Sequence, residues 1–204
     1  RIKSKNFINF NGGKSLLEIK IQQLKKNKKF NKIYISSDSD RARKIAKEHG
    51  VDFLLRDKLM CKKETRWSDV VEYIMDTIPG NPIVTWALAT APLFSRFDRA
   101  IDTFLKNVGK HDSLVGVLPK KSFIINEYGQ GINFNPGVWH PYSQQLKTHY
   151  EVTGSTYIGQ KSNMKKWHYW FGINPYLFEV TKIESIDVDT QEDFNLAKRI
   201  YDIK

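Results

Sequence analysis

Apolar side chains recur along this chain with two alternating patterns, one typical of helices and one typical of buried strands. Leu17, Ile21 and Leu24 have the spacing of one helix face, and the same spacing returns several times further along. Between these segments lie short apolar runs such as 82–88 (PIVTWAL), which is typical of a strand buried on both faces. The pattern predicts helices over 14–26, 40–49, 68–78, 96–107 and 191–201, and strands over 32–37, 52–55, 82–88 and 113–118.

The alternation of strand and helix predicts an α/β fold with a largely parallel sheet and helices on both of its faces. The length of 204 residues predicts a single domain that covers 1–204. Ligands of such folds bind in the crevice beyond the carboxyl ends of the strands. The segments 36–38 and 89–91, which follow predicted strands, are therefore the first places to look for chemistry.

The pattern changes over 119–157, where turn-forming glycines and prolines are frequent and helical spacing is absent. This composition predicts an inserted arm rich in loops or β-structure. A strand over 155–158 is expected to lead back into the domain.

The charge balance narrows the possible partners. The chain has 33 Lys and Arg against 22 Asp and Glu, a net charge of +11, which suggests nucleic acid, anionic lipid or phosphate-bearing substrates. Most of the excess lies in 1–35, and the run from Lys20 to Lys32 lacks the stacking aromatic residues typical of nucleic-acid binding. We expect that run to form a solvated helix face, and we expect no nucleic-acid or membrane partner.

The cysteine content and the N-terminal sequence bear on the cellular compartment in which the protein is expected. The single cysteine, Cys61, excludes an intrachain disulfide framework and a zinc site built on several cysteines. It suits a reducing compartment, so a cytoplasmic location is expected. No signal peptide is recognisable, and because the sequence starts at Arg1, we expect it to begin inside a longer protein.

The segment 184–190 (ESIDVDT) is the most informative motif. Asp187 and Asp189 alternate with Ile186 and Val188, so on a strand both carboxylates point to one face. Two such carboxylates repel each other unless a cation lies between them, and Mg²⁺ takes ligands of this kind together with substrate phosphates. Alternatively, Asp189 or its neighbour caps the helix predicted from Gln191. Spacing alone leaves both interpretations open.

Several blocks, in order along the chain, resemble the CMP-sugar synthetases, the acylneuraminate cytidylyltransferase family. The segment 184–198 resembles the C-terminal signature of that family, and 1–6 (RIKSKN) resembles the end of its nucleotide loop, SKRIPxKN. The block 90–93 (TAPL) resembles TSPL. Further matching blocks are 10–17, 30–38, 55–56, 112–117 and 153–157. The resemblance implies a three-layer Rossmann-like nucleotidyltransferase fold, a protruding arm over 119–157 that forms a homodimer and helps to bind sugar, CTP as co-substrate, and Mg²⁺.

The resemblance also implies a reaction, in which the hydroxyl of an acidic sugar attacks the α-phosphorus of CTP and pyrophosphate leaves. Such transfers depend mainly on positioning and charge neutralisation. The implied metal ligands are Asp187 and Asp189, which with Lys5 form the implied catalytic set. The implied nucleotide-binding residues are Arg1, Lys5, Asn6, Arg56 and Thr90, and the implied sugar-binding residues are Gln144, Gln145, Lys147 and Tyr157.

Departures from the family pattern concern both substrates. The strand and the loop portion that precede SKRIPxKN in the family are absent from the sequence; we expect them ahead of Arg1, because the strand over 82–88 otherwise lacks a neighbour. Leu88 replaces a Gln, Phe94 replaces an Arg, Trp67 stands at a small serine, and Ser143 replaces the Arg of RQQLP. A sugar other than N-acetylneuraminate is therefore expected, and a catalytically impaired homologue that binds nucleotide or sugar as a partner protein is the alternative.

Overall fold

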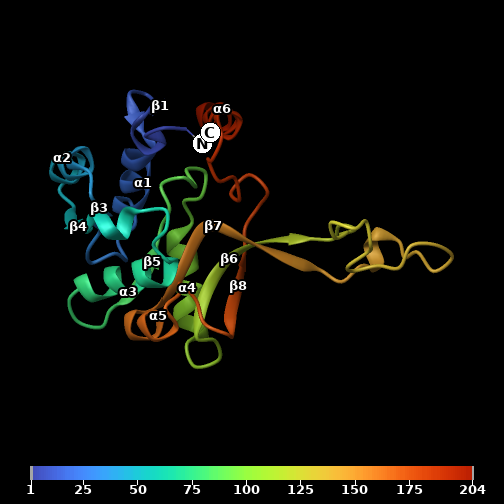
Figure 1. Cartoon of the computed structure of the whole chain (residues 1–204). Coiled ribbons are helices and arrows are strands. Elements are labelled where there is room, and N and C mark those ends of the chain that lie inside the picture. The colour runs from blue at the N-terminus through green and yellow to red at the C-terminus, as the bar shows by residue number, and fades with distance from the viewer. Residues whose placement is uncertain (1, 204) are drawn as a thin grey trace.

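The computed structural model describes residues 2–203 and shows a body of strands and helices from which one long arm projects (Figure 1). The helices are α1 (Leu16–Lys25), α2 (Asp40–His49), α3 (Trp67–Thr77), α4 (Phe97–Asn107), α5 (Lys161–Trp167) and α6 (Gln191–Ile203). The strands are β1 (Asn9–Asn11), β2 (Lys14–Ser15), β3 (Tyr34–Ser37), β4 (Asp52–Leu55), β5 (Ile83–Trp86), β6 (Ser113–Lys120), β7 (His149–Gln160) and β8 (Pro175–Glu179). No helix among residues 2–203 is both long and apolar enough to cross a membrane.

Local sequence accounts for most helix boundaries. Ser15 and Glu18 form a capping box at the start of α1, so the backbone amides of both residues have hydrogen-bond acceptors. Ser39 caps α2, and Gly50 ends it in a left-handed conformation with φ 62°, which glycine adopts without strain. The helices predicted from the apolar spacing are therefore all present, with ends shifted by a few residues at most.

The sheet is mixed, so the prediction of a largely parallel sheet is wrong. Four strands pair in the order β5-β7-β6-β8, in which β7 is antiparallel to both β5 and β6 while β6 and β8 are parallel. The reason is that β7 returns from the arm and inserts between two strands that point the other way. The strands β3 and β4 form a separate parallel pair.

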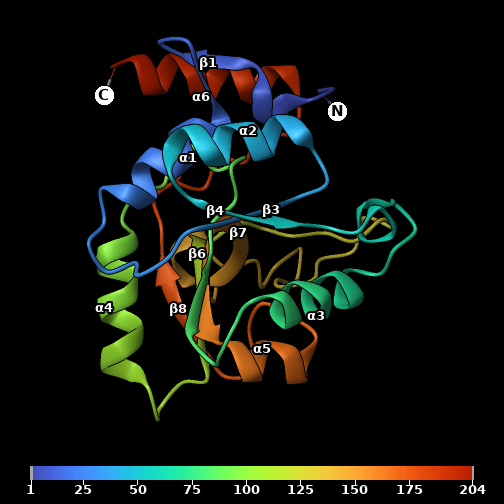
Figure 2. The ribbon, with the colours of Figure 1, turned by 90° about the vertical axis from the view of Figure 1, so that its left-hand side faces the viewer.

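Helices cover both faces of the four-stranded sheet, as predicted. Figure 2 shows α4 on one side and α3 with α5 on the other. Phe97 and Phe104 of α4 pack with Leu114 of β6 in one apolar cluster. Val71 and Met75 of α3 belong to a second cluster, together with Met164 of α5. The body therefore has three layers, with the sheet between two layers of helices.

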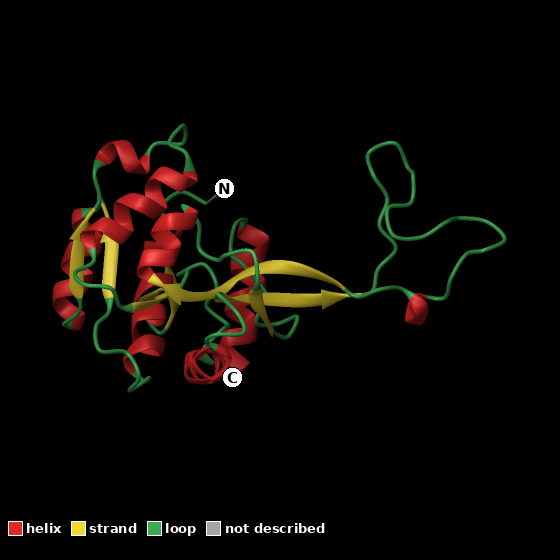
Figure 3. Ribbon diagram, turned by 90° about the horizontal axis from the view of Figure 1, so that it is seen from below, coloured by secondary structure: helices red, strands yellow, loops and turns green. Residues whose placement is uncertain are grey.

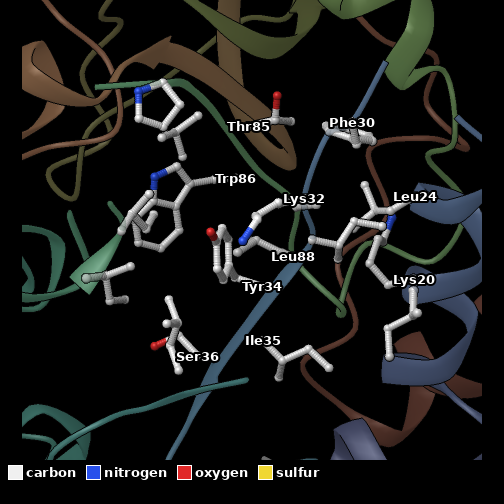
Figure 4. Close-up of a pocket in the computed structure, with 18 of the residues that line it drawn as sticks. Lys20, Leu24, Phe30, Lys32, Tyr34, Ile35, Ser36, Thr85, Trp86 and Leu88 are labelled. Carbon is white, nitrogen blue, oxygen red and sulfur yellow. The ribbon is translucent and has the colours of Figure 1, made fainter. Parts of the chain in front are cut away.

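A groove separates the two sheets. Figure 3 shows β3 and β4 apart from the other strands, and Figure 4 shows the cavity of 640 Å³ that is lined by β3 and by 83–89. Within residues 2–203, β5 pairs only with β7, and Ile83 is 42% exposed. The prediction that 82–88 is buried on both faces is therefore wrong, because no residue of 82–88 is fully buried and this segment lines the cavity.

The arm begins as a two-stranded ribbon. The outer part of β6 pairs with the first residues of β7, from Val117 opposite Val152 to Lys120 opposite His149. The strand predicted over 155–158 therefore starts earlier, and its inner half lies in the body. Beyond the ribbon, 121–148 is mostly loop and carries exposed apolar side chains, among them Val138 (95% exposed) and Trp139 (86% exposed).

Candidate functional site

Asp187 and Asp189 lie on an irregular segment that leads into α6. The prediction of a strand is wrong here, because the segment has one backbone bond to the body, from the Val188 amide to the Thr90 carbonyl (2.8 Å). The alternation still holds in one respect: Ile186 and Val188 pack into the same apolar cluster beneath α6. The carboxylate-bearing segment is thereby attached to the loop that follows β5.

Lys5 lies against this segment. Its Nζ donates to Asp189 Oδ1 and to the Val188 carbonyl, both at 2.6 Å. A short 3₁₀ turn over Lys5–Phe7, entered through Ser4 at φ 55°, brings the lysine there. The structure thus places together a cation and a carboxylate that are 184 positions apart in the chain.

Asp187 is held in a more enclosed setting. Its Oδ1 is buried and has no hydrogen-bond partner among residues 2–203. A Cβ at Gly154 would lie 3.1 Å from Asp187 Oδ2, so glycine lets β7 approach this carboxylate closely. Burial raises the pKa of Tyr157, and Tyr169 and the negative charge of Asp187 add to this shift. A buried carboxylate oxygen without a partner is costly, and a bound cation would satisfy it.

The donor set suits a metal that is shared with phosphates. Within the described chain, no group of three or more His, Cys, Asp and Glu could hold an ion. Two carboxylates alone match the way Mg²⁺ binds through one or two protein ligands plus water and substrate phosphate oxygens. Asp187 and Asp189 therefore fit Mg²⁺ in the presence of a nucleotide.

The helix cap does not involve the Asp189 side chain. Asp193 Oδ2 accepts from the Thr190 amide (2.7 Å) and the Asp189 amide (3.1 Å), and the Asp193 amide donates to Thr190 Oγ1 (3.2 Å). These bonds, led by the one from the Thr190 amide, lower the pKa of Asp193. The alternative that Asp189 caps α6 is therefore wrong, whereas its neighbour Thr190 does serve the cap.

Two of the residues predicted for the nucleotide, Asn6 and Arg56, line the groove. Asn6 lines the groove and its Oδ1 is buried without a partner among the described residues. Arg56 donates to Ser36 Oγ (3.2 Å) and to the Ser36 carbonyl (3.0 Å), and both residues line the groove. Thr90 contributes the carbonyl that holds Val188. Arg1 lies outside the described residues.

The residues predicted for the sugar fall into two places. Gln144, Gln145 and Lys147 are exposed on the arm, beside a cavity of 530 Å³ that Gln145 and Lys147 help to line. The arm that carries them projects away from the body of the chain (Figure 1). Tyr157, in contrast, lies on β7 in the body, is 3% exposed, and stacks on Trp170 with ring centroids 4.4 Å apart.

Sequence reasoning missed Lys20. The expected solvated face from Lys20 to Lys32 is wrong at its first residue, which is 2% exposed. The other end of the run does face solvent, where Lys29 pairs with Asp102. The signal was present, since Lys20 lies four positions from both Leu16 and Leu24 and so on the apolar stripe of α1.

Comparison with known proteins gives a consistent family. A family model described as "Cytidylyltransferase" matches residues 1–204. The chain is 25% identical to pseudaminic acid cytidylyltransferase of Campylobacter jejuni, over 100% of this chain and 91% of the relative. It is 23% identical to N-acylneuraminate cytidylyltransferase of Streptococcus agalactiae serotype III, over 79% of this chain and 40% of the relative.

Solved structures agree at the level of the fold. A CMP:2-keto-3-deoxy-manno-octonic acid synthetase complexed with CTP superposes with a TM-score of 0.72 and 11% identity, covering 100% of this chain and 93% of that chain. The 4-diphosphocytidyl-2C-methyl-D-erythritol synthase of Anaerococcus prevotii superposes with a TM-score of 0.70 and 15% identity, covering 98% and 94%. The ordered sequence blocks, the fold and the full-length family match lead to one conclusion: this chain belongs to the cytidylyltransferase family.

Proposed function

We propose that this protein transfers CMP from CTP to the hydroxyl of an acidic sugar, a ulosonic or nonulosonic acid of the sialic-acid kind, and releases pyrophosphate. The observation that carries the proposal is that Lys5 binds Asp189 on the segment that also carries Asp187, beside the loop that follows β5. Two curated relatives are named for pseudaminic acid and N-acylneuraminate, which supports an acidic sugar as the acceptor.

The carboxylates and the lysine have different electrostatic roles in this proposal. Asp187 and Asp189 would hold Mg²⁺, which when bound neutralises phosphate charge and lowers the pKa of an oxygen bound to it. Lys5 lies 2.6 Å from Asp189 Oδ1, so its ammonium group both fixes that carboxylate and adds positive charge where phosphates would lie. Asn6 and Arg56, which line the groove, would bind the nucleoside and its phosphates.

In this proposal, one more strand lies between β3 and β5 and joins their two sheets. An extended apolar segment in the groove would pair with both β3 and β5, whose facing edges are without a partner in residues 2–203. This agrees with the strand expected ahead of the nucleotide loop. In a form of the protein that carries such a strand, the groove-facing amides of β3 and β5 should exchange slowly, and in the 204-residue chain they should exchange fast; the amides already bonded to β4 and β7 should be protected in both.

The arm supplies the sugar site of a second copy. Its exposed apolar side chains, with Val138 and Trp139 most exposed, suit an interface between two chains. In a homodimer, Gln144, Gln145 and Lys147 of one chain would approach the carboxylates of the other. Lys147 then offers the cation that the sugar carboxylate needs, in place of the guanidinium that Ser143 lacks.

The test is pyrophosphate release from CTP and Mg²⁺ with a panel of acidic sugars: pseudaminic acid, N-acetylneuraminate and 2-keto-3-deoxy-manno-octonic acid. We expect turnover with at least one sugar, loss of activity in Asp187→Asn, and retention in the matched control Glu192→Gln, an exposed acid on α6. Magnesium-dependent CTP binding without turnover of any sugar would instead support the impaired homologue. The absence of both CTP binding and sugar turnover would refute the proposal.

A further inference from the structure

Lys20 of α1 is a buried cation that binds the loop after β5. Its Nζ donates to the carbonyl oxygens of Ala91 (2.8 Å) and Phe94 (2.9 Å). The ammonium also lies 5.0 Å from the ring centroid of Phe97. Burial lowers its pKa to about 7. A lysine is seldom buried in this way, because desolvation disfavours its charged form, so the contacts it makes call for an explanation.

Gln23, one turn later on α1, extends the same contact. Its Nε2 donates to the Pro92 carbonyl at 2.6 Å. Lys20 and Gln23 together therefore bind three carbonyls between Ala91 and Phe94. Pro92 has no amide hydrogen of its own to fix the turn. Side chains of α1 thus determine where the backbone of this loop lies.

The same loop is hydrogen-bonded to the segment that carries the candidate metal ligands. The Thr90 carbonyl, one residue before Ala91, accepts from the Val188 amide at 2.8 Å. Val188 is fully buried between Asp187 and Asp189, and its own carbonyl accepts from Lys5 Nζ. A continuous series of hydrogen bonds and peptide units therefore joins Lys20 to both carboxylates.

A change in the loop itself points the same way. Phe94, which replaces an arginine of the family pattern, is fully buried against Phe97 with ring centroids 5.0 Å apart. Lys20 of α1 supplies hydrogen-bond donors to the carbonyls of this loop. Its place in the groove wall is shown in Figure 4.

We propose that Lys20, assisted by Gln23, is a positioning residue of the reaction. By fixing the loop 90–94, it determines the position of Asp187 and Asp189 relative to the nucleotide phosphates. Mg²⁺ demands near-ideal octahedral geometry, so a small displacement of two carboxylates weakens its binding and slows transfer. This inference rests on the proposed function, and Lys20 itself touches no substrate.

The test compares Lys20→Met, which keeps the length of the side chain but removes its donors, with Lys26→Met, an exposed lysine at the end of the same helix. In Lys20→Met the Mg²⁺ concentration for half-maximal activity should rise about tenfold, as for other supporting partners of metal ligands. The kcat should fall roughly ten- to hundredfold, while the KM for CTP at saturating Mg²⁺ stays nearly constant. Calorimetric titration of Mg²⁺ into the complex with CTP should show the same weakening without any turnover.

Two further results keep the inference falsifiable. If Lys20→Met does not give a cooperative melting transition, Gln23→Leu replaces it, because Gln23 is only half-buried; a smaller shift of the same kind is then expected. Unchanged Mg²⁺ dependence in the folded variants, with an active parent protein, overturns the positioning role alone. A parent protein that neither binds CTP with Mg²⁺ nor turns over any sugar overturns the proposed function, and the inference with it.

Discussion

Replacing Arg96 tests how the segment that carries the carboxylates is attached to the body. Arg96 precedes α4 and makes a bidentate pair with Glu184, through Nε to Oε1 (2.6 Å) and Nη2 to Oε2 (2.7 Å). Glu184 also accepts from the Thr181 amide at 2.8 Å. Its side chain is 11% exposed and that of Arg96 is 30% exposed. Arg96→Met therefore leaves a nearly buried carboxylate without its cation.

The magnitude follows from this burial. Removing one partner of a fully buried pair costs about 3–5 kcal/mol. Water that reaches the exposed third of Arg96 reduces this, and the bond from Thr181 remains, so we expect about 2 kcal/mol. With a urea m-value of roughly 2.5 kcal/mol/M, the unfolding midpoint at pH 7 should fall by about 0.8 M.

The pH dependence of folding stability is a second, independent test. Burial alone would raise the pKa of Glu184, but the hydrogen bonds from Arg96 and Thr181 outweigh it and hold the pKa below 4.5. A lowered pKa in the folded state contributes stability above the unfolded value and loses it as the pH falls through the folded value. The difference between the parent protein and Arg96→Met should therefore be large at pH 7 and shrink as the pH falls below 4.5.

Arg99→Met is the matched control, since Arg99 is an exposed arginine on α4. Its urea midpoint should stay close to that of the parent protein. Equal midpoints for Arg96→Met and Arg99→Met at pH 7 would refute the reasoning, as would a difference from the parent that grows in acid.

Three further outcomes are expected. Lys5→Met should lower kcat by at least roughly tenfold, while Lys3→Met, in the same basic terminus but exposed, should not; comparable losses would speak against a specific role. Because burial lowers the pKa of Lys20 to about 7, stability should rise with pH above 7, and urea midpoints in Lys20→Met should lack that rise. Trp139→Ser should shift a dimer toward monomer in analytical ultracentrifugation, and an unchanged sedimentation coefficient would contradict the role of the arm.

Local elements of the fold were predictable because their signals are local. The α2 helix has its cap at Ser39, its apolar stripe and its terminal Gly50 within a dozen positions. The sheet order was not predictable in the same way, since it depends on β7 returning from the arm between β5 and β6. The strand β8 was missed because the aromatic segment before it has no clear period.

The candidate site shows the same division. The paired carboxylates were visible from spacing, and the family resemblance implied that Lys5 acts with them, but neither predicted the hydrogen bond from Lys5 to Asp189, which joins the two ends of the chain. The burial of Lys20 lay in the helical spacing, but its charge led to the opposite expectation. Hydrogen-bond partners such as the Ala91 carbonyl depend on tertiary contacts that periodicity does not describe.

The central claim is tested most directly by the identity of the product. The protein is incubated with CTP, Mg²⁺ and the acidic sugar that supports turnover, and the products are identified by mass spectrometry and ³¹P NMR. The account predicts a sugar–CMP ester and pyrophosphate in equal amounts, with the ester lost in Asp187→Asn and retained in Glu192→Gln. Formation of the ester at the same rate by Asp187→Asn, or release of CDP and phosphate instead, would contradict it.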